Sequence, residues 1–195
     1  MCVSIIKIIK NKFRIALLKI QHLTDIIFLL MDISLEEFIL SFHIVLVEPE
    51  IPQNTGNIAR TCAATNTTLH LVKPLGFSID EKSVRRAGLD YWRYVDVVVH
   101  DSLMAFLGEF PNARMFLSTT HGDRIYTDFK YKDGDMFLFG RETAGLPQEL
   151  ISENRDSAIR IPMSENTRLR SLNLANSVNI VLFEALRQNG FPELL

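Results

Sequence analysis

Cysteine is scarce in this chain, and the two cysteines present exclude most disulfide and zinc frameworks. Cys2 and Cys62 lie far apart, with neither the pairing nor the spacing that such frameworks need. We therefore expect a reducing, cytoplasmic location. Cys62 stands among small residues in a segment expected to be helical, where a thiol usually packs as a small hydrophobe. A buried Cys62 is the expectation that follows.

An excess of charge is also missing. The sequence carries 21 basic and 23 acidic residues, which gives a formal net charge of −2. Many nucleic-acid-binding domains are basic overall, so RNA contact here would require a local patch. No apolar run approaches the roughly 18 residues that span a bilayer, and we expect no membrane partner. The 195 residues, 47% of them hydrophobic, are enough for one globular domain with a sizeable core.

Several familiar ligand motifs are absent. The sequence has no Gly-x-Gly-x-x-Gly, no P-loop and no His-Glu-x-x-His, and its five histidines lack metal-ligand spacing. Ser118 and Ser171 have no evident His/Asp grouping for nucleophilic catalysis. These absences argue against the usual dinucleotide fold and against metal chemistry, and we expect no metal.

Residues 1–42 contain neither glycine nor proline, and half of them are Ile, Leu or Phe. Basic residues between positions 7 and 19 alternate with apolar ones at a spacing typical of a basic amphipathic helix. The segment could lie on a membrane surface, pack on the core or a partner, or be no native part of the protein, with translation starting near Met31. We favour the third alternative, because residues 43–195 read as a self-sufficient single domain and the extension adds no motif.

The remaining sequence alternates apolar strands with helical patterns. Segments rich in Val, Ile and Leu are expected to be strands: His43–Glu48, Leu69–Lys73, Asp96–His100, Arg114–Thr119, Met136–Phe139 and Ala158–Ile161. Helices are expected from Asn54 or Thr55 to about Asn66 and over Glu81–Ala87, Ser102–Phe110, Leu146–Ile151 and Leu172–Asn189. This order predicts an α/β fold with a mainly parallel sheet and helices on both faces. Ligands bind such sheets beyond the carboxyl ends of the strands, where the loops after residues 48, 119, 139 and 161 would meet.

Three polar segments carry the functional signal. Asn54–Arg60 contains Gly56, which permits close backbone approach, but the segment also fits a capped helix with a solvated arginine. Phe139–Pro147 fits a ligand loop bearing the Glu142 carboxylate, or a turn that places Glu142 in the first turn of a helix. Residues 160–176 fit either an arginine-bearing surface loop or a polar ligand site at a helix start. Each segment alone leaves both alternatives open.

In combination, the three segments resemble the three motifs of the SPOUT RNA methyltransferases: Asn-x-Gly-Asn-Ile-x-Arg, Phe-Gly-x-Glu-x-x-Gly-Leu-Pro and Ile-Pro-Met…Arg-Ser-Leu-Asn-Leu-x-Asn. Residues 48–57 and 85–92 look like the small branch of that family, which 2′-O-methylates the wobble nucleotide of tRNA, a cytidine or uridine type. The match covers about residues 42–192. It departs from the family pattern at Arg141, where proline is frequent, and at Ala175, where serine is usual.

The resemblance implies an α/β fold that binds S-adenosylmethionine and carries a deep C-terminal trefoil knot. The positions that match the family's cofactor site are Leu117, Ser118, Thr119, Gly140, Ile161, Met163, Ser171 and Leu172. Backbone groups of these loops would pair with the adenine edge, while the apolar side chains would form walls around the ring.

By the same resemblance, Arg60 is the main catalytic residue, with Asn54, Glu142 and Asn173 beside it. A guanidinium hardly deprotonates in proteins, so we favour a role in which Arg60 grips a backbone phosphate that takes the proton. The family acts as a homodimer, in which Arg60 reaches toward the partner's cofactor. The residues of the last helix expected at that interface, or alternatively in the core, are Val178, Val181, Leu182, Ala185 and Leu186.

The implied substrate is the anticodon stem-loop of tRNA. Candidate contacts to its phosphates and bases are Arg85, Arg86, Tyr91, Trp92, Arg168 and Arg170. Two other functions stay open, namely 2′-O-methylation of ribosomal RNA and binding of RNA or cofactor without catalysis. Relatives that act on ribosomal RNA usually carry an extra RNA-binding domain, and the presence of Arg60, Glu142 and Asn173 favours an enzyme.

Overall fold

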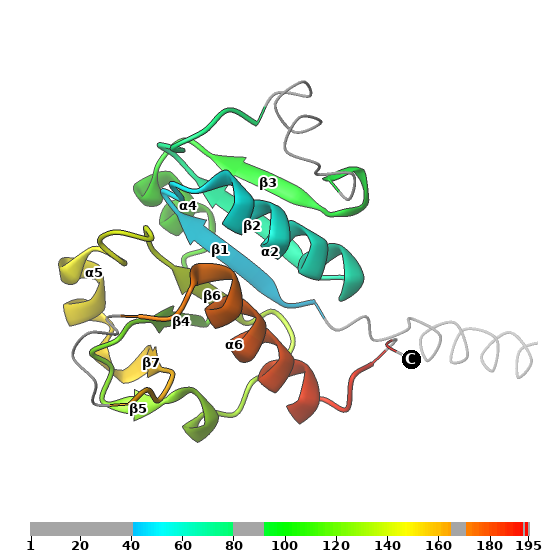
Figure 1. Cartoon of the computed structure of the whole chain (residues 1–195). Helices are drawn as coiled ribbons and strands as arrows, with labels where there is room; N and C mark the ends of the chain where they lie inside the picture. Colours follow the sequence, from blue (N-terminus) through cyan, green and yellow to red (C-terminus); the bar gives the residue numbers. More distant parts are fainter. Residues whose placement is uncertain (1–40, 80–91, 165–170, 193, 195) are drawn as a thin grey trace, which may run out of the picture. The chain divides into compact units, whose positions relative to one another are not determined.

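The computed structural model describes residues 41–79, 92–164, 171–192 and 194, which form a seven-stranded sheet. All paired strands run parallel, in the order β3-β2-β1-β6-β4-β7-β5 (Figure 1). The strands are β1 (His43–Val47), β2 (Thr68–Val72), β3 (Val97–His100), β4 (Met115–Ser118), β5 (Arg124–Ile125), β6 (Met136–Phe139) and β7 (Ala158–Arg160). The predicted α/β class with a parallel sheet is confirmed.

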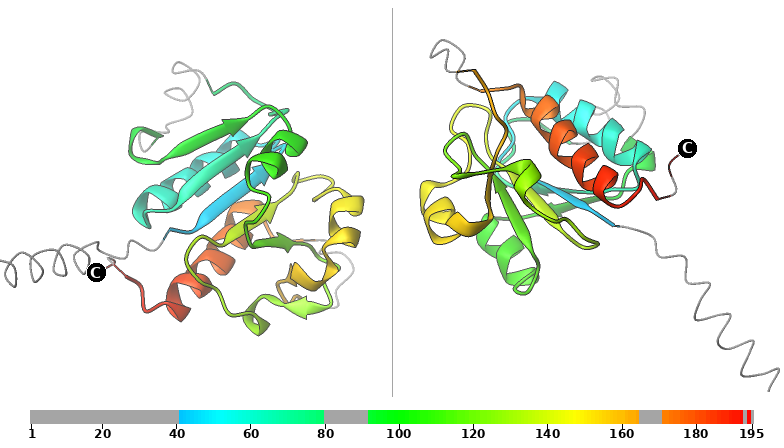
Figure 2. Two further views of the ribbon diagram at one scale, coloured as in Figure 1. Left: turned by 180° about the vertical axis from the view of Figure 1, so that it is seen from behind. Right: turned by 90° about the horizontal axis from the view of Figure 1, so that it is seen from below.

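Helices cover both faces of the sheet (Figure 2). On one face α2 (Pro52–Ala64) and α6 (Leu174–Gln188) lie side by side. On the other face lie the shorter helices α4 (Leu103–Glu109) and α5 (Gln148–Glu153). Single turns of 3₁₀-helix follow at η1 (Trp92–Tyr94), η2 (Tyr126–Asp128) and η3 (Arg155–Ser157). No helix in the described ranges combines the length and the apolar character that crossing a bilayer demands.

Strand β1 shows how the sequence divides the core between the two faces. Successive side chains of a strand point to opposite sides, so Ile44 and Leu46 pack with α2 and α6. Val45 and Val47 instead pack with Phe106 of α4. Both layers are dry, because none of these four β1 side chains exposes more than 2% of its surface. Apolar residues on both faces explain why the strand reads as a continuous hydrophobic run.

Cys62 lies in the core between α2 and the sheet, as its sequence context predicted. Its side chain has no exposed surface, and burial raises the pKa of the thiol to about 12. Phe42 also belongs to this core, with 1% of its surface exposed. The amphipathic helix was predicted within residues 1–42, and the structure does not describe residues 1–40. The helix predicted over 81–87 also lies outside the described residues.

The start of α2 differs from the prediction. The sequence suggested Asn54 or Thr55 as the capping residue, whereas the helix begins at Pro52 with Ile51 at the N-cap. Proline suits the first helical turn, because its fixed φ is helical and its missing N–H would have no partner there. The Asn54 side chain is therefore not used as a cap and is available for a tertiary contact.

Two further elements were misplaced or missed. Helix α5 begins at Gln148 and not at Leu146, because Leu146 is buried in the core beneath α4 and Pro147 holds extended backbone. Strand β5 was not predicted at all. It has only two residues, too few for an apolar periodicity, and it pairs with β7 at the edge of the sheet.

Three histidines from neighbouring strands form a hydrogen-bonded row. His43 Nδ1 lies 3.0 Å from His70 Nε2, and His70 Nδ1 lies 2.9 Å from His100 Nε2. His100 Nδ1 lies 3.1 Å from Glu109 Oε2, and Phe106 packs edge-on against the His70 and His100 rings. Burial, with smaller contributions from the two neighbouring imidazoles, lowers the pKa of His70 to about 3. Within the described ranges, these and other His, Cys, Asp and Glu side chains form no group of three or more suited to holding a metal.

Acid is expected to destabilise the fold through His70. Its folded-state pKa lies below the unfolded value of about 6.5, so the unfolded chain binds the proton first. The stability is fully present above pH 6.5 and is lost as pH falls toward 3, by on the order of 3 kcal/mol at pH 4. Urea unfolding at pH 7 and pH 4 should show a smaller acid loss in His70→Gln than in the wild type. The exposed His121→Gln should keep the wild-type loss, and an unchanged loss in His70→Gln would contradict the assignment.

Candidate active site

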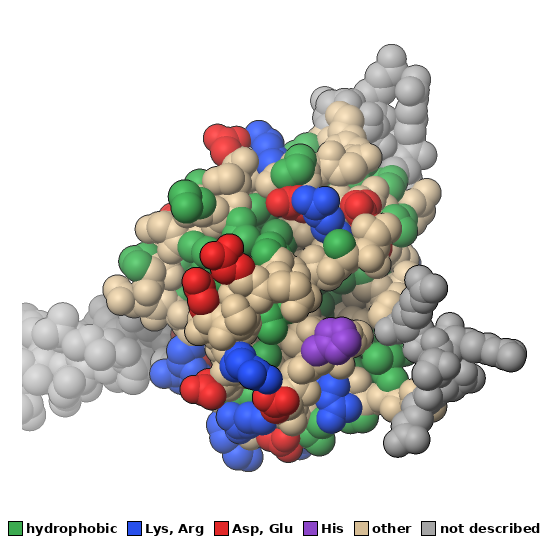
Figure 3. Space-filling model, turned by 90° about the vertical axis from the view of Figure 1, so that its left-hand side faces the viewer, with side chains coloured by type: hydrophobic (Ala, Val, Ile, Leu, Met, Phe, Trp, Pro, Cys, Tyr) green, Lys and Arg blue, Asp and Glu red, His purple; other side chains and the backbone are tan. Residues whose placement is uncertain are grey.

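A cavity of about 560 Å³ opens at the carboxyl end of the sheet. The loops that follow β1, β4, β6 and β7 line it, together with the first turn of α6. The cavity therefore lies at the strand ends that the sequence indicated for a ligand. Figure 3 shows the surface on the side of α5, where hydrophobic side chains lie among charged, His and other polar ones.

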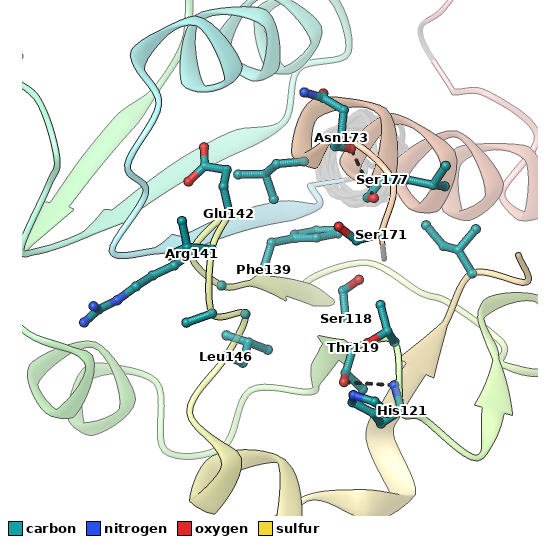
Figure 4. A pocket seen from close by; sticks show the side chains of 18 of the residues that line it. Ser118, Thr119, His121, Phe139, Arg141, Glu142, Leu146, Ser171, Asn173 and Ser177 are labelled. Carbon is teal, nitrogen blue, oxygen red and sulfur yellow. Dashed lines mark hydrogen bonds between the residues drawn. The ribbon is translucent and has the colours of Figure 1, made fainter. Parts of the chain in front are cut away.

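The cavity brings together the predicted cofactor residues with one exception. Ser118 and Thr119 come from the end of β4, and Ser171 faces them from the α6 side (Figure 4). The other predicted residues on the cavity wall are Gly140, Ile161, Met163 and Leu172. Leu117 does not line the cavity, because its side chain points into the core on the α4 face with 1% of its surface exposed.

Three of the four predicted catalytic residues form one hydrogen-bonded chain beside the cavity. Asn173 caps α6, its Oδ1 accepting from the N–H groups of Ala175 and Asn176. Asn173 Nδ2 donates to Asn54 Oδ1 at 2.9 Å, and Asn54 Nδ2 donates to Glu142 Oε1 at 2.9 Å. The two amides are thereby oriented between the positive end of the α6 dipole and the Glu142 carboxylate.

The Glu142 carboxylate also accepts two backbone N–H groups from the loop after β1. Glu50 N donates to Oε2 at 2.8 Å, and Ile51 N donates to Oε1 at 3.2 Å. With Asn54, this makes three donors to one carboxylate. Charge-assisted hydrogen bonds of this kind hold a side chain in a single orientation. The loop after β1 thus fixes Glu142, and Glu142 fixes Asn54.

Arg141, which stands where the family often has proline, forms an ion pair with Glu48 at the end of β1. Its side chain points away from Ser118 and Ser171 in the cavity (Figure 4). Two backbone hydrogen bonds join Arg141 to Gly145 and close the turn between them. The departure from the family pattern therefore adds a second link between the loops after β1 and β6.

Arg60, the fourth predicted catalytic residue, is not on the cavity wall. It lies on the exposed face of α2, toward the end of the helix, whereas Asn54 lies buried near its start. Trp92 of η1 is partly buried and packs against the core. The predicted RNA contacts Arg85, Arg86, Tyr91, Arg168 and Arg170 lie outside the described residues.

The α6 residues expected at a dimer interface lie in the core of the chain itself. Val178, Val181, Leu182, Ala185 and Leu186 each expose 3% of their surface or less and pack toward the sheet. The core-facing alternative is correct for all five, because their spacing places them on the same face of the helix. The large apolar residue that α6 exposes is Phe183, at 47%.

Several residues that line the cavity were not predicted from the sequence. Thr120 and His121 directly follow the predicted Thr119, and Ser177 lies one turn into α6. His121 is exposed, and its N–H donates to Thr119 Oγ1 at 3.2 Å (Figure 4). Their position just past a strand end was the signal available, since loops at that edge of a parallel sheet converge on the site.

The chain is similar to known proteins over almost its entire described length. The sequence profile of the SpoU rRNA Methylase family matches residues 41–183. A Bacillus subtilis protein, provisionally named tRNA (cytidine(34)-2′-O)-methyltransferase, is 54% identical over 80% of this chain and 98% of its own. A solved structure described as giving insights into the 2-OH methylation of C/U34 on tRNA is 44% identical, with a TM-score of 0.72 and coverage of 78% and 98%.

A second solved structure has a longer chain. It is an AdoMet-bound rRNA methyltransferase from Sinorhizobium meliloti, 27% identical with a TM-score of 0.66, and the match covers 75% of this chain but 56% of that one. The resemblance to SPOUT methyltransferases that the three motifs suggested is thus confirmed on both sequence and structure. This chain belongs to the SpoU methylase family.

Proposed function

We propose that this protein transfers a methyl group from S-adenosylmethionine to the ribose 2′-oxygen of nucleotide 34, the wobble nucleotide of tRNA. The observation that carries the proposal is the Asn173–Asn54–Glu142 chain at the edge of a ligand-sized cavity. It joins residues from all three family motifs at one place. The names of relatives whose own chains are matched over nearly their whole length support the same reaction.

The cavity suits S-adenosylmethionine in size and chemistry. Its volume of about 560 Å³ lies within the range of roughly 300–1,000 Å³ that is usual for small-molecule sites. Ile161, Met163 and Leu172 offer apolar surface for an adenine ring, and Ser118 and Thr119 offer hydroxyl groups to polar atoms. When bound, this cofactor supplies a methyl group that its sulfonium has already activated.

The residues of the chain have to orient the ribose and dispose of one proton. Asn54 and Asn173 each use one amide hydrogen inside the chain, and each has a second amide hydrogen that would donate to substrate oxygens. Glu142 already accepts three N–H groups, so it is better suited to holding Asn54 than to removing the 2′-OH proton. We assign that proton to a backbone phosphate held by Arg60.

Arg60 would act across a homodimer. Its place on the exposed face of α2, off the cavity wall of its own chain, supports a site in which Arg60 reaches the cavity of a second copy. Phe183 exposes 47% of its surface on α6, the helix beside α2, and Leu172 exposes 39% at the cavity rim. Phe183 of α6 and Leu172, which precedes α6, would pack against the same residues of the partner, as a two-fold interface requires.

Mixed dimers provide a direct test of that arrangement. Arg60→Ala and Glu142→Ala chains, each inactive alone, are expected to recover about one quarter of the wild-type turnover after co-expression. Half of randomly formed dimers would be mixed, and each mixed dimer would hold one site with an intact cavity and an intact Arg60. Each variant co-expressed with itself serves as control. Activity no higher than in those controls would show that Arg60 acts within its own chain.

We also propose that the C-terminal part is knotted as in the family. Strand β7 lies between β4 and β5, whereas α6, which follows it in the chain, packs against β1 and β6. The Ser118–His121 loop lines the same cavity as Ile161 and Ser171, which supports this proposal.

A tRNA substrate is favoured over ribosomal RNA by the extent of the matches. The chain spans nearly all of the relative named for tRNA but just over half of the rRNA methyltransferase structure. The deciding experiment is transfer of labelled methyl groups from S-adenosylmethionine to unmodified bacterial tRNA, with mapping of the labelled nucleotide and Arg60→Ala as control. Label at ribose 34 supports the proposal. Label on ribosomal RNA alone would keep the reaction but identify ribosomal RNA as the substrate. No label on either RNA would favour a protein that binds RNA or cofactor without catalysis.

A further inference from the structure

Glu50 forms the counterpart of the Glu142 contact on the facing loop. Its carboxylate accepts the Thr143 N–H at 3.1 Å and the Thr143 hydroxyl at 2.8 and 3.0 Å. In return, Glu142 accepts the Glu50 N–H at 2.8 Å. The two loops follow β1 and β6, which are paired neighbours in the sheet. Glu142 thus holds the backbone of Glu50, and Glu50 holds the backbone of Thr143, the residue after Glu142, across the ends of adjacent strands.

The Glu50 contact acts on the tip of the 140–145 turn and not on its base. The base is closed by the two hydrogen bonds between Arg141 and Gly145. It is also held by Gly140, which packs so closely on Gly145 that a Cβ there would lie 2.0 Å from the Gly145 carbonyl carbon. The tip carries Glu142 and Thr143. Loss of the Glu50 carboxylate would therefore free the tip, while Gly140, the predicted cofactor residue of this turn, stays packed on Gly145 at the base.

The backbone of Glu50 is also held by the loop after β2, through Gly76. Gly76 N donates to Pro49 O at 2.9 Å, and a Cβ on Gly76 would lie 2.7 Å from the Glu50 Cα and carbonyl oxygen. The loop after β2 therefore backs the loop after β1. Glu50 does not line the cavity, so any effect on the reaction must pass through the residues it holds.

We propose that Glu50 is a positioning residue for methyl transfer: through Thr143 it fixes Glu142, and through Glu142 the amides of Asn54 and Asn173. The inference rests on the proposed function. An amide group displaced by about 1 Å from the geometry that the reaction needs can cost up to 100-fold in rate. Because the base of the turn is closed independently, the effect should appear in kcat and not in the affinity for S-adenosylmethionine.

The test compares Glu50→Ala, Glu50→Gln and Thr143→Val with the wild type. Glu50→Ala removes every acceptor, and we expect kcat to fall on the order of 10-fold with the KM for S-adenosylmethionine changed less than about 2-fold. Glu50→Gln keeps one acceptor for the Thr143 N–H and should recover most of the loss. Thr143→Val removes only the hydroxyl and should fall between them. Glu149→Ala, which removes an exposed carboxylate from α5, is the matched control and should keep wild-type kcat.

A second readout does not depend on catalysis. The side-chain amide NMR signals of Asn54 and Asn173 should shift in Glu50→Ala and stay in place in Glu149→Ala. Shifted signals together with an inactive wild type would overturn the proposed function, but they would still show that Glu50 orients the two amides. An active wild type whose kcat and amide signals are unchanged by Glu50→Ala would overturn the role of Glu50. Equal loss of kcat and cofactor affinity would also contradict it, since that pattern indicates collapse of the whole turn.

Discussion

Arg60→Lys is expected to lower kcat for tRNA methylation on the order of 100-fold, although lysine keeps the positive charge. A guanidinium presents a planar pair of N–H donors that matches two phosphate oxygens, whereas an ammonium offers a single point charge. If the phosphate that Arg60 holds takes the 2′-OH proton, its orientation matters as much as its charge. Steady-state turnover on unmodified tRNA, with the methylated ribose mapped, measures the effect.

Arg155→Lys is the matched control for that substitution. Arg155 is exposed in η3 and pairs with Asp123, so the same chemical change there should leave turnover unaltered. Circular dichroism and thermal melting would establish that both variants fold. Full activity in Arg60→Lys would rule out a bidentate contact between Arg60 and the phosphate. A comparable loss in Arg155→Lys would show that the assay responds to arginine replacement in general.

Gly140→Ala is expected to weaken S-adenosylmethionine binding by about 10- to 100-fold and to lower the free energy of unfolding by about 1–3 kcal/mol. A Cβ at this position would lie 2.0 Å from the Gly145 carbonyl carbon and 2.1 Å from the Leu146 amide nitrogen. Real side chains do not approach backbone so closely, so the turn would have to open. Both Gly140 and Leu146 line the cavity, and opening the turn displaces that wall. Calorimetric titration and urea unfolding measure the two effects.

The same substitution at Gly108 separates crowding from the general effect of a methyl group. A Cβ at Gly108 in α4 meets nothing within 4 Å, and alanine favours helix by up to about 1 kcal/mol over glycine. Gly108→Ala should therefore be neutral or slightly stabilising and should bind the cofactor normally. If Gly140→Ala behaved in the same way, the close packing of the turn would not be required for binding.

The sequence predicted the parallel α/β class because the strands are buried on both faces and read as continuous apolar runs. It also predicted the last helix but placed its start at Leu172, whereas α6 begins at Leu174 and Asn173 caps it. The start of α2 was misassigned because two neighbouring rules compete there: Asn54 is a good capping residue, but Pro52 is a better first helical residue. Strand β5 could not be predicted from the sequence, because two residues are too few to show an apolar periodicity.

The sequence by itself determined most of the elements, the three motifs and the residue types at the site. Only the tertiary structure decided which of those residues meet: Asn54 bonds to residues 88 and 119 positions away, and Glu50 to one 93 positions away. Those contacts depend on the strand order, which places the loops after β1 and β6 side by side and lays α6 across them. Local patterns record how each element is buried but not which element lies next to it. The same reason hid the row of His43, His70 and His100, whose members come from three different strands.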